Sequence, residues 1–289
     1  MNDEDLVAGS RFGLDLDDAR RVIATALEED LRYGADATTE ATVPADAVAV
    51  AELTPRAAGV LAGIPVALEV FRRVTDVEVL DRRSDGDKAV PGEPALVLRG
   101  PVRGLLTAER TALNLLCHLS GVATLTAAWV DEVAGTKAAV RDSRKTLPGL
   151  RLLEKYAVRC GGGVNHRLGL GDAVLIKDNH VRAAGSVRAA MAAVRAHAPH
   201  LACEVEVDSL DQLDEAVAEG AELVLLDNFT VADCAEAVRR VASADVRLEA
   251  SGGLTLDVAR AYAETGVDYL AVGGLTHSAP ALDLGLDLR

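Results

Sequence analysis

The chain has 289 residues, 49% of them hydrophobic, which is enough for one large or two medium domains with packed cores. Its formal net charge of −15 argues against broad nucleic-acid binding, because the phosphates would be repelled. No apolar run approaches the length of a membrane span, and the acidic start MNDEDLVAGS lacks the order of a signal peptide. The four cysteines form no Cys-x-x-Cys pair, which argues against a disulfide framework or zinc site. We therefore expect a soluble cytoplasmic protein that binds neither nucleic acid nor membrane.

The first third of the chain predicts a small antiparallel sheet with helices. Apolar residues at helical spacing indicate a helix over 16–31, which Asp15 or Asp17 could cap. Three extended stretches separated by turn residues follow, at Val48–Leu53, Val77–Leu80 and Ala95–Leu98. Two apolar helices then come, with Gly121 between them, at Thr107–Leu119 and Val122–Val133.

After Gly135 the pattern changes to short apolar runs with helical segments between the later ones. The runs are Ala138–Val140, Ala173–Ile176, Cys203–Val207, Leu223–Leu226, Arg247–Ala250 and Tyr269–Val272, and the clearest helices are Leu210–Ala218 and Val231–Val241. Alternating strands and helices imply parallel strands joined by right-handed crossovers. Six such strands predict an α/β barrel smaller than the eight-stranded form, with an open doubly wound sheet as the alternative.

A cationic stretch stands out in this acidic chain. Nine Lys and Arg residues against four acids give residues 141–182 a charge of +5, which leaves −20 for the rest. Arg144 and Lys145 follow the first run, and Lys177 ends the second, so the cations fall at strand ends, where α/β barrels carry their chemistry. This predicts an anion pocket, although charge alone would equally fit a solvated, salt-bridged surface.

Two motifs of this stretch leave site and surface open. Arg141–Thr146 joins cations to hydroxyls, although such a run alone is more often surface charge than a site. Gly161–Gly163 precede the His166-Arg167 pair, which fits an exposed loop as well as a site. Lys177 ends a strand whose sequence predicts burial on both faces, and a Lys at such depth normally needs an anionic partner.

Carboxylates and glycines follow the later strands. Glu204 and Glu206 share one strand face, and Asp227 ends the next strand. Such carboxylates suit ribose hydroxyls, Mg²⁺ or a developing positive charge, or they could merely neutralise the cations. Glycines after the last two strands, in 251–253 and 273–274, would let backbone N–H groups approach a phosphate.

A set of short motifs runs over nearly the whole chain: Ala108-Glu109-Arg110 with Asn114 and Ser120-Gly121, Asp142-Ser143-Arg144-Lys145-Thr146 with Pro148-Gly149, Asn165-His166-Arg167, Ile176-Lys177-Asp178-Asn179-His180, Glu204-Val205-Glu206-Val207, Leu226-Asp227-Asn228, Glu249-Ala250-Ser251-Gly252-Gly253 and Leu275-Thr276-His277-Ser278. Together these motifs resemble those of the quinolinate phosphoribosyltransferases. The early motif Asp36-Ala37-Thr38-Thr39 is loosened by Ala35 and Ala37, and Ser143 stands where Thr is more usual.

The resemblance implies an N-terminal α/β sandwich domain over 1–120 and a catalytic α/β barrel of about six strands over 121–278. The tail, about 279–289, would pack back on the first domain. It also implies a homodimer, or a higher oligomer, in which each site is completed by the partner subunit. The reaction would join quinolinate to phosphoribosyl pyrophosphate, with Mg²⁺ required, giving nicotinate mononucleotide, pyrophosphate and carbon dioxide in de novo NAD biosynthesis.

The resemblance also assigns roles to residues. Lys145, Glu206 and Asp227 would be catalytic, and the last two would hold Mg²⁺, directly or through water or substrate. The substrate-binding set would be Arg110 from the neighbouring subunit, Ser143, Arg144, His166, Arg167, Lys177, Ser251, Gly252, Gly253, Gly273, Gly274, Leu275 and His277.

Three other functions fit parts of the pattern. A paralogue of the same fold could act on another anionic acceptor, although Arg110, Arg144, Arg167 and Lys177 together favour a dicarboxylate. A Schiff-base aldolase could use Lys177 at its strand end. A non-catalytic binder of sugar phosphates would not need so many polar residues at strand ends.

Overall fold

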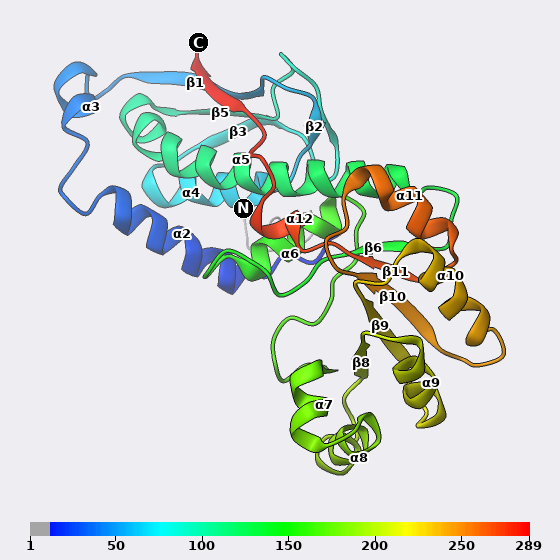
Figure 1. Ribbon diagram of the computed structural model, residues 1–289. Coiled ribbons are helices and arrows are strands. Elements are labelled where there is room, and N and C mark those ends of the chain that lie inside the picture. Colours follow the sequence, from blue (N-terminus) through cyan, green and yellow to red (C-terminus); the bar gives the residue numbers. More distant parts are fainter. Residues whose placement is uncertain (1–11) are drawn as a thin grey trace. The chain divides into compact units, whose positions relative to one another are not determined.

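The computed structural model describes residues 12–289, which fall into two compact units (Figure 1). The first unit contains the described part of 1–127 together with 146–162 and 274–289, and the second contains 128–145 and 163–273. The acidic stretch MNDEDLVAGS, which argues against a signal peptide, lies outside the described residues.

The first unit is built on a four-stranded antiparallel sheet in the order β12-β1-β5-β3. Its strands are β1 (Val48–Pro55), β3 (Glu78–Arg82), β5 (Leu96–Pro101) and β12 (Leu284–Leu288), beside a short ribbon of β2 (Gly59–Val60) and β4 (Lys88–Ala89). Its helices are α2 (Leu16–Asp30), α3 (Ala37–Thr42), α4 (Ile64–Val74), α6 (Arg151–Cys160) and α12 (Gly274–His277), with most of α5 (Val102–Glu132). The C-terminal strand β12 thus pairs with β1, near the other end of the chain.

Several local predictions for this unit are confirmed. Asp15 caps α2, because its carboxylate accepts the backbone N–H of Asp18 at 2.9 Å. The three predicted extended stretches correspond to β1, β3 and β5. Ala51 and Leu53 of β1 are fully buried, and Glu52 between them is buried as well, so burial along this strand does not simply alternate.

The prediction of two helices flanking Gly121 is wrong, since one helix, α5, runs without a break from Val102 to Glu132. Gly121 serves close packing instead of a turn. A Cβ atom at this position would lie 2.1 Å from the carbonyl oxygen of Pro280, in the segment that leads to β12. The last residues of α5, from 128 onward, belong to the second compact unit, and residues 146–162 group with the first.

Helix α5 also corrects the expectation that no segment is long and apolar enough to cross a membrane. By length and composition alone it passes that test, with a mean hydropathy of 1.4 over its most apolar window. However, 56% of that window is buried inside the protein, as expected for the core helix of a folded domain.

The second unit is a sheet of six parallel strands in the order β6-β11-β10-β9-β8-β7. The strands are β6 (Ala139–Arg141), β7 (Val174–Ile176), β8 (Cys203–Val207), β9 (Leu223–Asp227), β10 (Arg247–Ser251) and β11 (Tyr269–Ala271). The helices are α7 (Asp178–Ala184), α8 (Val187–His197), α9 (Leu210–Ala218), α10 (Val231–Arg240) and α11 (Leu256–Glu264). Sequential strands are neighbours, and the first lies beside the last, which is the order of an α/β barrel.

This order confirms the predicted six-stranded α/β fold and differs from a doubly wound sheet, whose strand order reverses partway. Among residues 12–289, no strand pairing joins β6 to β7, so the barrel is open at that seam. There Val164 forms an isolated parallel bridge with Arg141.

The strand register separates an apolar face from a polar face. Residues paired in register point to the same side of a sheet, and successive residues alternate. One face carries the buried residues Val140, Ile176, Val205, Val207, Val224, Leu226, Leu248, Ala250 and Leu270. The opposite face carries charged and hydroxyl residues together with three leucines, among them Arg141, Glu204, Glu206, Asp227, Glu249, Ser251, Leu175, Leu223 and Leu225. The helices bury the first face, so the second is left to hold polar chemistry.

Substitution of Gly121 tests the close approach between α5 and the C-terminal segment. Gly121→Ala should lower the free energy of unfolding by about 1–3 kcal/mol, because the added methyl group overlaps the Pro280 carbonyl. Chemical denaturation would measure the change. Gly171→Ala is the matched control, since nothing lies within 4 Å of its added Cβ. Equal stability of the two variants would contradict this account of the packing.

Candidate functional site

The residues predicted to form a site follow the carboxyl ends of the parallel strands. Ser143, Arg144 and Lys145 come after β6, and Lys177 directly follows β7. Asp227 ends β9, Ser251 ends β10, and Gly273 lies just beyond β11. Because the strands are parallel, these ends meet at one edge of the sheet. Arg110, Gly274, Leu275 and His277 belong to the first unit, in α5 and α12.

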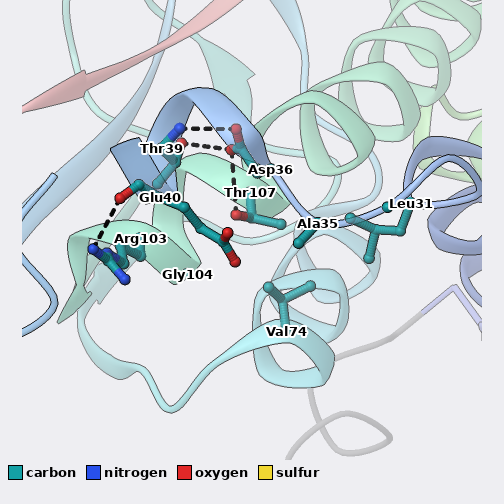
Figure 2. Close-up of a pocket in the computed structure, with 10 residues that line it drawn as sticks. Leu31, Ala35, Asp36, Thr39, Glu40, Val74, Arg103, Gly104 and Thr107 are labelled. Atoms are coloured by element: carbon teal, nitrogen blue, oxygen red, sulfur yellow. Dashed lines mark hydrogen bonds between the residues drawn. The ribbon is translucent and has the colours of Figure 1, made fainter. Parts of the chain in front are cut away.

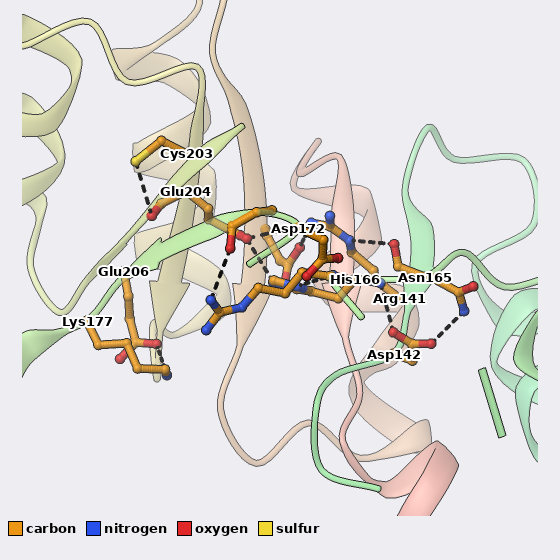
Figure 3. Close-up of polar contacts among 12 residues, drawn as sticks. Arg141, Asp142, Asn165, His166, Asp172, Lys177, Cys203, Glu204 and Glu206 are labelled. Atoms are coloured by element: carbon orange, nitrogen blue, oxygen red, sulfur yellow. Dashed lines mark hydrogen bonds and ion pairs between the residues drawn. The ribbon is translucent and has the colours of Figure 1, made fainter. Parts of the chain in front are cut away.

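Lys177 and Glu206 form an ion pair, with Nζ and Oε2 2.5 Å apart (Figure 3). The predicted anionic partner of Lys177 is therefore present within the protein. The predicted burial is wrong, since 45% of the Lys177 side chain is exposed, because β7 is a short edge strand that ends one residue earlier. An exposed Lys on the partly buried Glu206 can be shared with an anionic ligand.

The turn that carries His166 and Arg167 is fixed by the buried carboxylate of Asp142. Its Oδ2 accepts the side-chain amide of Asn165 at 2.6 Å, and its Oδ1 accepts the backbone N–H of His166 at 2.8 Å. Asp142 follows β6 and is fully buried, so these hydrogen bonds tie the turn to the end of that strand.

The imidazole of His166 has a protein partner at each ring nitrogen. Nδ1 lies 2.7 Å from the backbone nitrogen of Arg167, which can only donate. Nδ1 must therefore accept, so Nε2 carries the hydrogen and donates it to Glu204 Oε2 at 2.8 Å. The hydrogen-bond geometry thus assigns the Nε2–H tautomer.

Glu204 and His166 belong to a buried charge cluster with Arg141 and Glu249, all in the second unit (Figure 3 draws the Arg141 and Glu204 side). The Arg141 guanidinium lies 2.5 Å from Glu249 Oε2 and 3.9 Å from Glu204 Oε2, and it stacks over the Tyr269 ring at 4.8 Å. Glu204 and Glu249 are 3% and 0% exposed, and Oε1 of each lacks a hydrogen-bond partner.

The cluster holds two carboxylates against one permanent cation. Burial first, and the nearby Glu204 carboxylate second, raise the pKa of Glu249 to about 7 against the opposing pull of Arg141 and His166. His166, Glu204 and Glu249 also offer ligand atoms within 4.8 Å of one another, as a metal ion would require. The guanidinium of Arg141 already supplies positive charge there, which favours a proton over a divalent ion as the remaining counter-charge.

The sequence analysis names Glu204 as a candidate carboxylate and Arg141 as part of the cationic stretch, but it assigns neither of them, nor Glu249, a role in the site. A local signal existed for Glu204, which lies two residues before Glu206 and therefore on the same face. The local signal for Glu249 was weaker: it is an acid within the largely buried strand β10. The pairing of Arg141 with Glu249 depends on β6 lying beside β11, which no local pattern reveals.

Two arginines present unused donors at the predicted anion pocket. The Nε atoms of Arg144 and Arg167 are buried and lack a hydrogen-bond partner, whereas Arg167 NH1 donates to the Ala173 carbonyl at 3.2 Å. Burial lowers the pKa of Arg167, and the like charge of Arg144 adds to the effect. Two guanidiniums that repel each other and keep free donors are stabilised when an anion binds between them.

The loops after β9 and β10 are tightly joined. The backbone N–H of Asn228 donates to the Ser251 carbonyl at 2.9 Å, and Asn228 itself has a positive φ of 57°. Gly252 has a φ of 104°, and a Cβ atom there would lie 2.4 Å from Asn228 Oδ1. Only glycine fits this position, which leaves backbone N–H groups accessible at the strand ends.

The loosened Asp36-Ala37-Thr38-Thr39 motif has a local structural role in the first unit. Asp36 caps α3, because its carboxylate accepts the backbone N–H and the hydroxyl of Thr39 at 3.0 and 2.5 Å (Figure 2). These hydrogen bonds lower the pKa of Asp36. The Thr107 hydroxyl of α5 also donates to Asp36 at 3.4 Å, so the motif links α3 to α5. Ala35 and Ala37 take no part in these contacts, which explains why they are tolerated.

Six parallel strands in barrel order, with cations and carboxylates at their carboxyl ends, define an α/β-barrel enzyme. Residues 36–120 match the model of the N-terminal domain of quinolinate phosphoribosyl transferase, and residues 122–287 match that of its C-terminal domain. The chain therefore belongs to the quinolinate phosphoribosyltransferase family.

Similar proteins carry a consistent name. The nicotinate-nucleotide pyrophosphorylase (carboxylating) of Mycobacterium leprae is 61% identical over 279 residues, which covers 95% of this chain and 98% of the relative. A probable nicotinate-nucleotide pyrophosphorylase (carboxylating) of Bacillus subtilis is 42% identical, covering 82% of this chain and 83% of the relative. The solved structure of the Francisella tularensis nicotinate-nucleotide pyrophosphorylase superposes with a TM-score of 0.91 at 39% identity, covering 96% and 98% of the two chains.

The charge of Glu249 gives a testable pH dependence of stability. In the unfolded chain its pKa is the ordinary 4.5, and in the folded protein it is higher. Its contribution to the unfolding free energy is therefore fully present below pH 4.5 and is lost as the pH rises through the folded value. Wild type should lose stability relative to Glu249→Gln between about pH 5 and pH 8, as measured by denaturation. The unfolding free energy of the exposed Glu222→Gln variant should change with pH as that of wild type does. A difference in unfolding free energy between wild type and Glu249→Gln that stays the same at every pH would contradict the raised pKa of Glu249.

Proposed function

We propose that this chain transfers the phosphoribosyl group of phosphoribosyl pyrophosphate to quinolinate and removes one carboxylate. The products are nicotinate mononucleotide, pyrophosphate and carbon dioxide, a step of de novo NAD biosynthesis. One observation supports the proposal in addition to family membership: Arg144, which follows β6, and Arg167, in the turn after Val164, each keep a buried, unused Nε donor. A small dicarboxylate satisfies both guanidiniums, which match carboxylates through planar pairs of hydrogen bonds.

Quinolinate binding rests on the cations at the first two strand ends. Arg144 and Arg167 hold the carboxylates, with Ser143 beside Arg144 and with Lys177 released from part of its pairing to Glu206. The family resemblance adds Arg110 from a neighbouring subunit, which makes the working unit a homodimer or a larger assembly of it. The family resemblance is also the basis for proposing that the protein is cytoplasmic.

Phosphoribosyl pyrophosphate binding falls to the later strand ends. Lys145 contacts the phosphates as a point charge, while Glu206 and Asp227 face the ribose hydroxyls. The 5′-phosphate is held by backbone N–H groups and hydroxyls of the loops after β10 and β11, with Ser251, Gly252, Gly253, Gly273, Gly274, Leu275 and His277 as the binding residues. The tight join between Gly252 and Asn228 supports such close backbone approach.

The family resemblance implies Mg²⁺, and the carboxylates at the strand ends fit it. Glu206 and Asp227 lie on one face of neighbouring strands and offer the oxygen ligands that Mg²⁺ prefers. When bound, directly or through water and substrate, the ion neutralises the negative charge of the pyrophosphate group.

The mechanism begins with breakage of the bond between the ribose C1 and pyrophosphate. Positive charge develops on the sugar, and the carboxylates of Glu206 and Asp227 stabilise it. The pyridine nitrogen of quinolinate then supplies the electron pair for the new C1–N bond. The ring nitrogen is now positively charged, so the adjacent carbon can keep the electron pair of its bond to the departing carboxylate. A proton from water takes the vacated position, and carbon dioxide leaves.

A single assay tests the proposal. The purified chain, phosphoribosyl pyrophosphate, Mg²⁺ and quinolinate should form nicotinate mononucleotide and carbon dioxide, whereas nicotinate as the acceptor should not react. Turnover with another acceptor alone would indicate a paralogue. Borohydride trapping of a carbonyl substrate on Lys177 would indicate an aldolase, and tight binding without turnover would indicate a binder.

The carboxylates assigned to the sugar can be neutralised one at a time. Glu206→Gln and Asp227→Asn should each lower kcat on the order of a hundredfold, because the positively charged transition state loses a fixed negative partner. Asp257→Asn, an exposed position in α11, is the matched control and should keep wild-type kcat. Unchanged turnover in both site variants would show that the roles are wrongly assigned.

The metal requirement is tested separately. Chelation with EDTA should abolish turnover, and added Mg²⁺ should restore it. Equilibrium binding of quinolinate alone should persist in EDTA, because the cations that hold its carboxylates belong to the protein. Full turnover of the metal-depleted enzyme would remove Mg²⁺ from the proposal.

A further inference from the structure

His166 connects the buried charge cluster to a residue of the anion pocket. Its Nδ1 accepts the backbone N–H of Arg167 at 2.7 Å, and its Nε2 donates to Glu204 Oε2 at 2.8 Å. The ring therefore lies between the carboxylate of a barrel strand and the main chain of the Arg that keeps a buried, unused Nε donor. Rotation of the ring would break both hydrogen bonds at once.

Glu204 is itself held rigidly. It lies inside β8, which pairs on both sides with β7 and β9, and its carboxylate is 3% exposed. The Arg141 guanidinium lies 3.9 Å from Glu204 Oε2 and compensates part of its charge. A buried acceptor inside a paired strand is a fixed reference point. Asp142 holds the Asn165 side chain and the His166 backbone, whereas the backbone N–H of Arg167 is held by the His166 ring.

We propose that Glu204 is a positioning residue for the transferase reaction, acting through the fixed imidazole of His166 to hold Arg167 where it binds the quinolinate carboxylate. The inference rests on the proposed function and deepens it. It differs from the expectation that His166 contacts quinolinate, because both ring nitrogens are already engaged by protein groups.

The hydrogen-bond chain requires an acceptor at position 204, and it does not require a negative charge there. An amide oxygen can accept the Nε2–H as a carboxylate does, while an apolar side chain leaves a buried donor unpaired. Glu204→Gln should therefore preserve the position of Arg167, and Glu204→Leu should release it. A residue that acted on substrate by its charge would lose function equally in both variants.

Calorimetric binding to the full-length protein gives the comparison. Glu204→Leu should weaken quinolinate binding on the order of tenfold, the cost of one unsatisfied buried hydrogen bond. Glu204→Gln should stay close to wild type, and phosphoribosyl pyrophosphate should bind all forms alike. Glu222→Leu, at the exposed residue just before β9, is the matched control for adding an apolar side chain.

The tautomer of His166 provides a second measurement that needs no substitution. Nitrogen NMR of the wild-type protein should show an unprotonated Nδ1 and a protonated Nε2 for this ring, and Glu204→Gln should keep that signature. This readout remains decisive if Glu204→Leu fails to fold.

Three results would overturn the proposal: an Nδ1–H tautomer in the wild type, unchanged quinolinate affinity in folded Glu204→Leu, or equal losses in the Gln and Leu variants. Failure of the wild type to bind quinolinate would instead remove the proposed function. Quinolinate binding by the wild type therefore separates failure of the Glu204 proposal from failure of the proposed function. The expected set of results supports the Glu204 proposal and the proposed function together.

Discussion

The ion pair between Arg141 and Glu249 holds the polar interior of the second unit together. Glu249 stands on β10, and Arg141 stands on β6, with β11 between them. The guanidinium reaches Glu249 across the ring of Tyr269, the residue that pairs in register with Glu249. Removal of Arg141 would leave the two buried carboxylates Glu204 and Glu249 without their cation, which is far more costly than the pair itself is stabilising. The arrangement of Glu204 and His166 around this pair depends on it.

A barrel interior of this kind is a compromise between stability and function. The outer face of the six strands is apolar and packs under helices, so the hydrophobic effect stabilises the fold from outside. The inner face gives up apolar burial at Glu204 and Glu249 and replaces it with a network of fixed charges. Such a network need not move when an anionic substrate arrives, which is the main advantage of preorganised electrostatics in catalysis.

Much of this molecule is predictable from its sequence, because the strands of α/β barrels are short apolar runs with polar ends. The run Cys203–Val207 matches β8 residue for residue, and Leu210–Ala218 matches α9. The cations at the ends of β6 and β7 are visible for the same reason. What the sequence does not show depends on contacts between distant residues. Gly121 indicates a turn until the carbonyl of Pro280 is known to lie against it, and Glu249 has no visible partner until β6 is placed next to β11.

The pairing of β12 with β1 has a consequence for how the protein is made. Strand β1 is completed at Pro55, but its outer neighbour begins only at Leu284. At a synthesis rate of about 5–20 residues per second, the ribosome needs roughly 10 to 50 seconds to cover that distance. Throughout that interval one edge of β1 has no native partner, and such an edge is a template for pairing with other chains. The folding yield of the first unit therefore depends on translation speed and on any chaperone that shields this edge. This dependence lasts long after most residues of the unit have been synthesised.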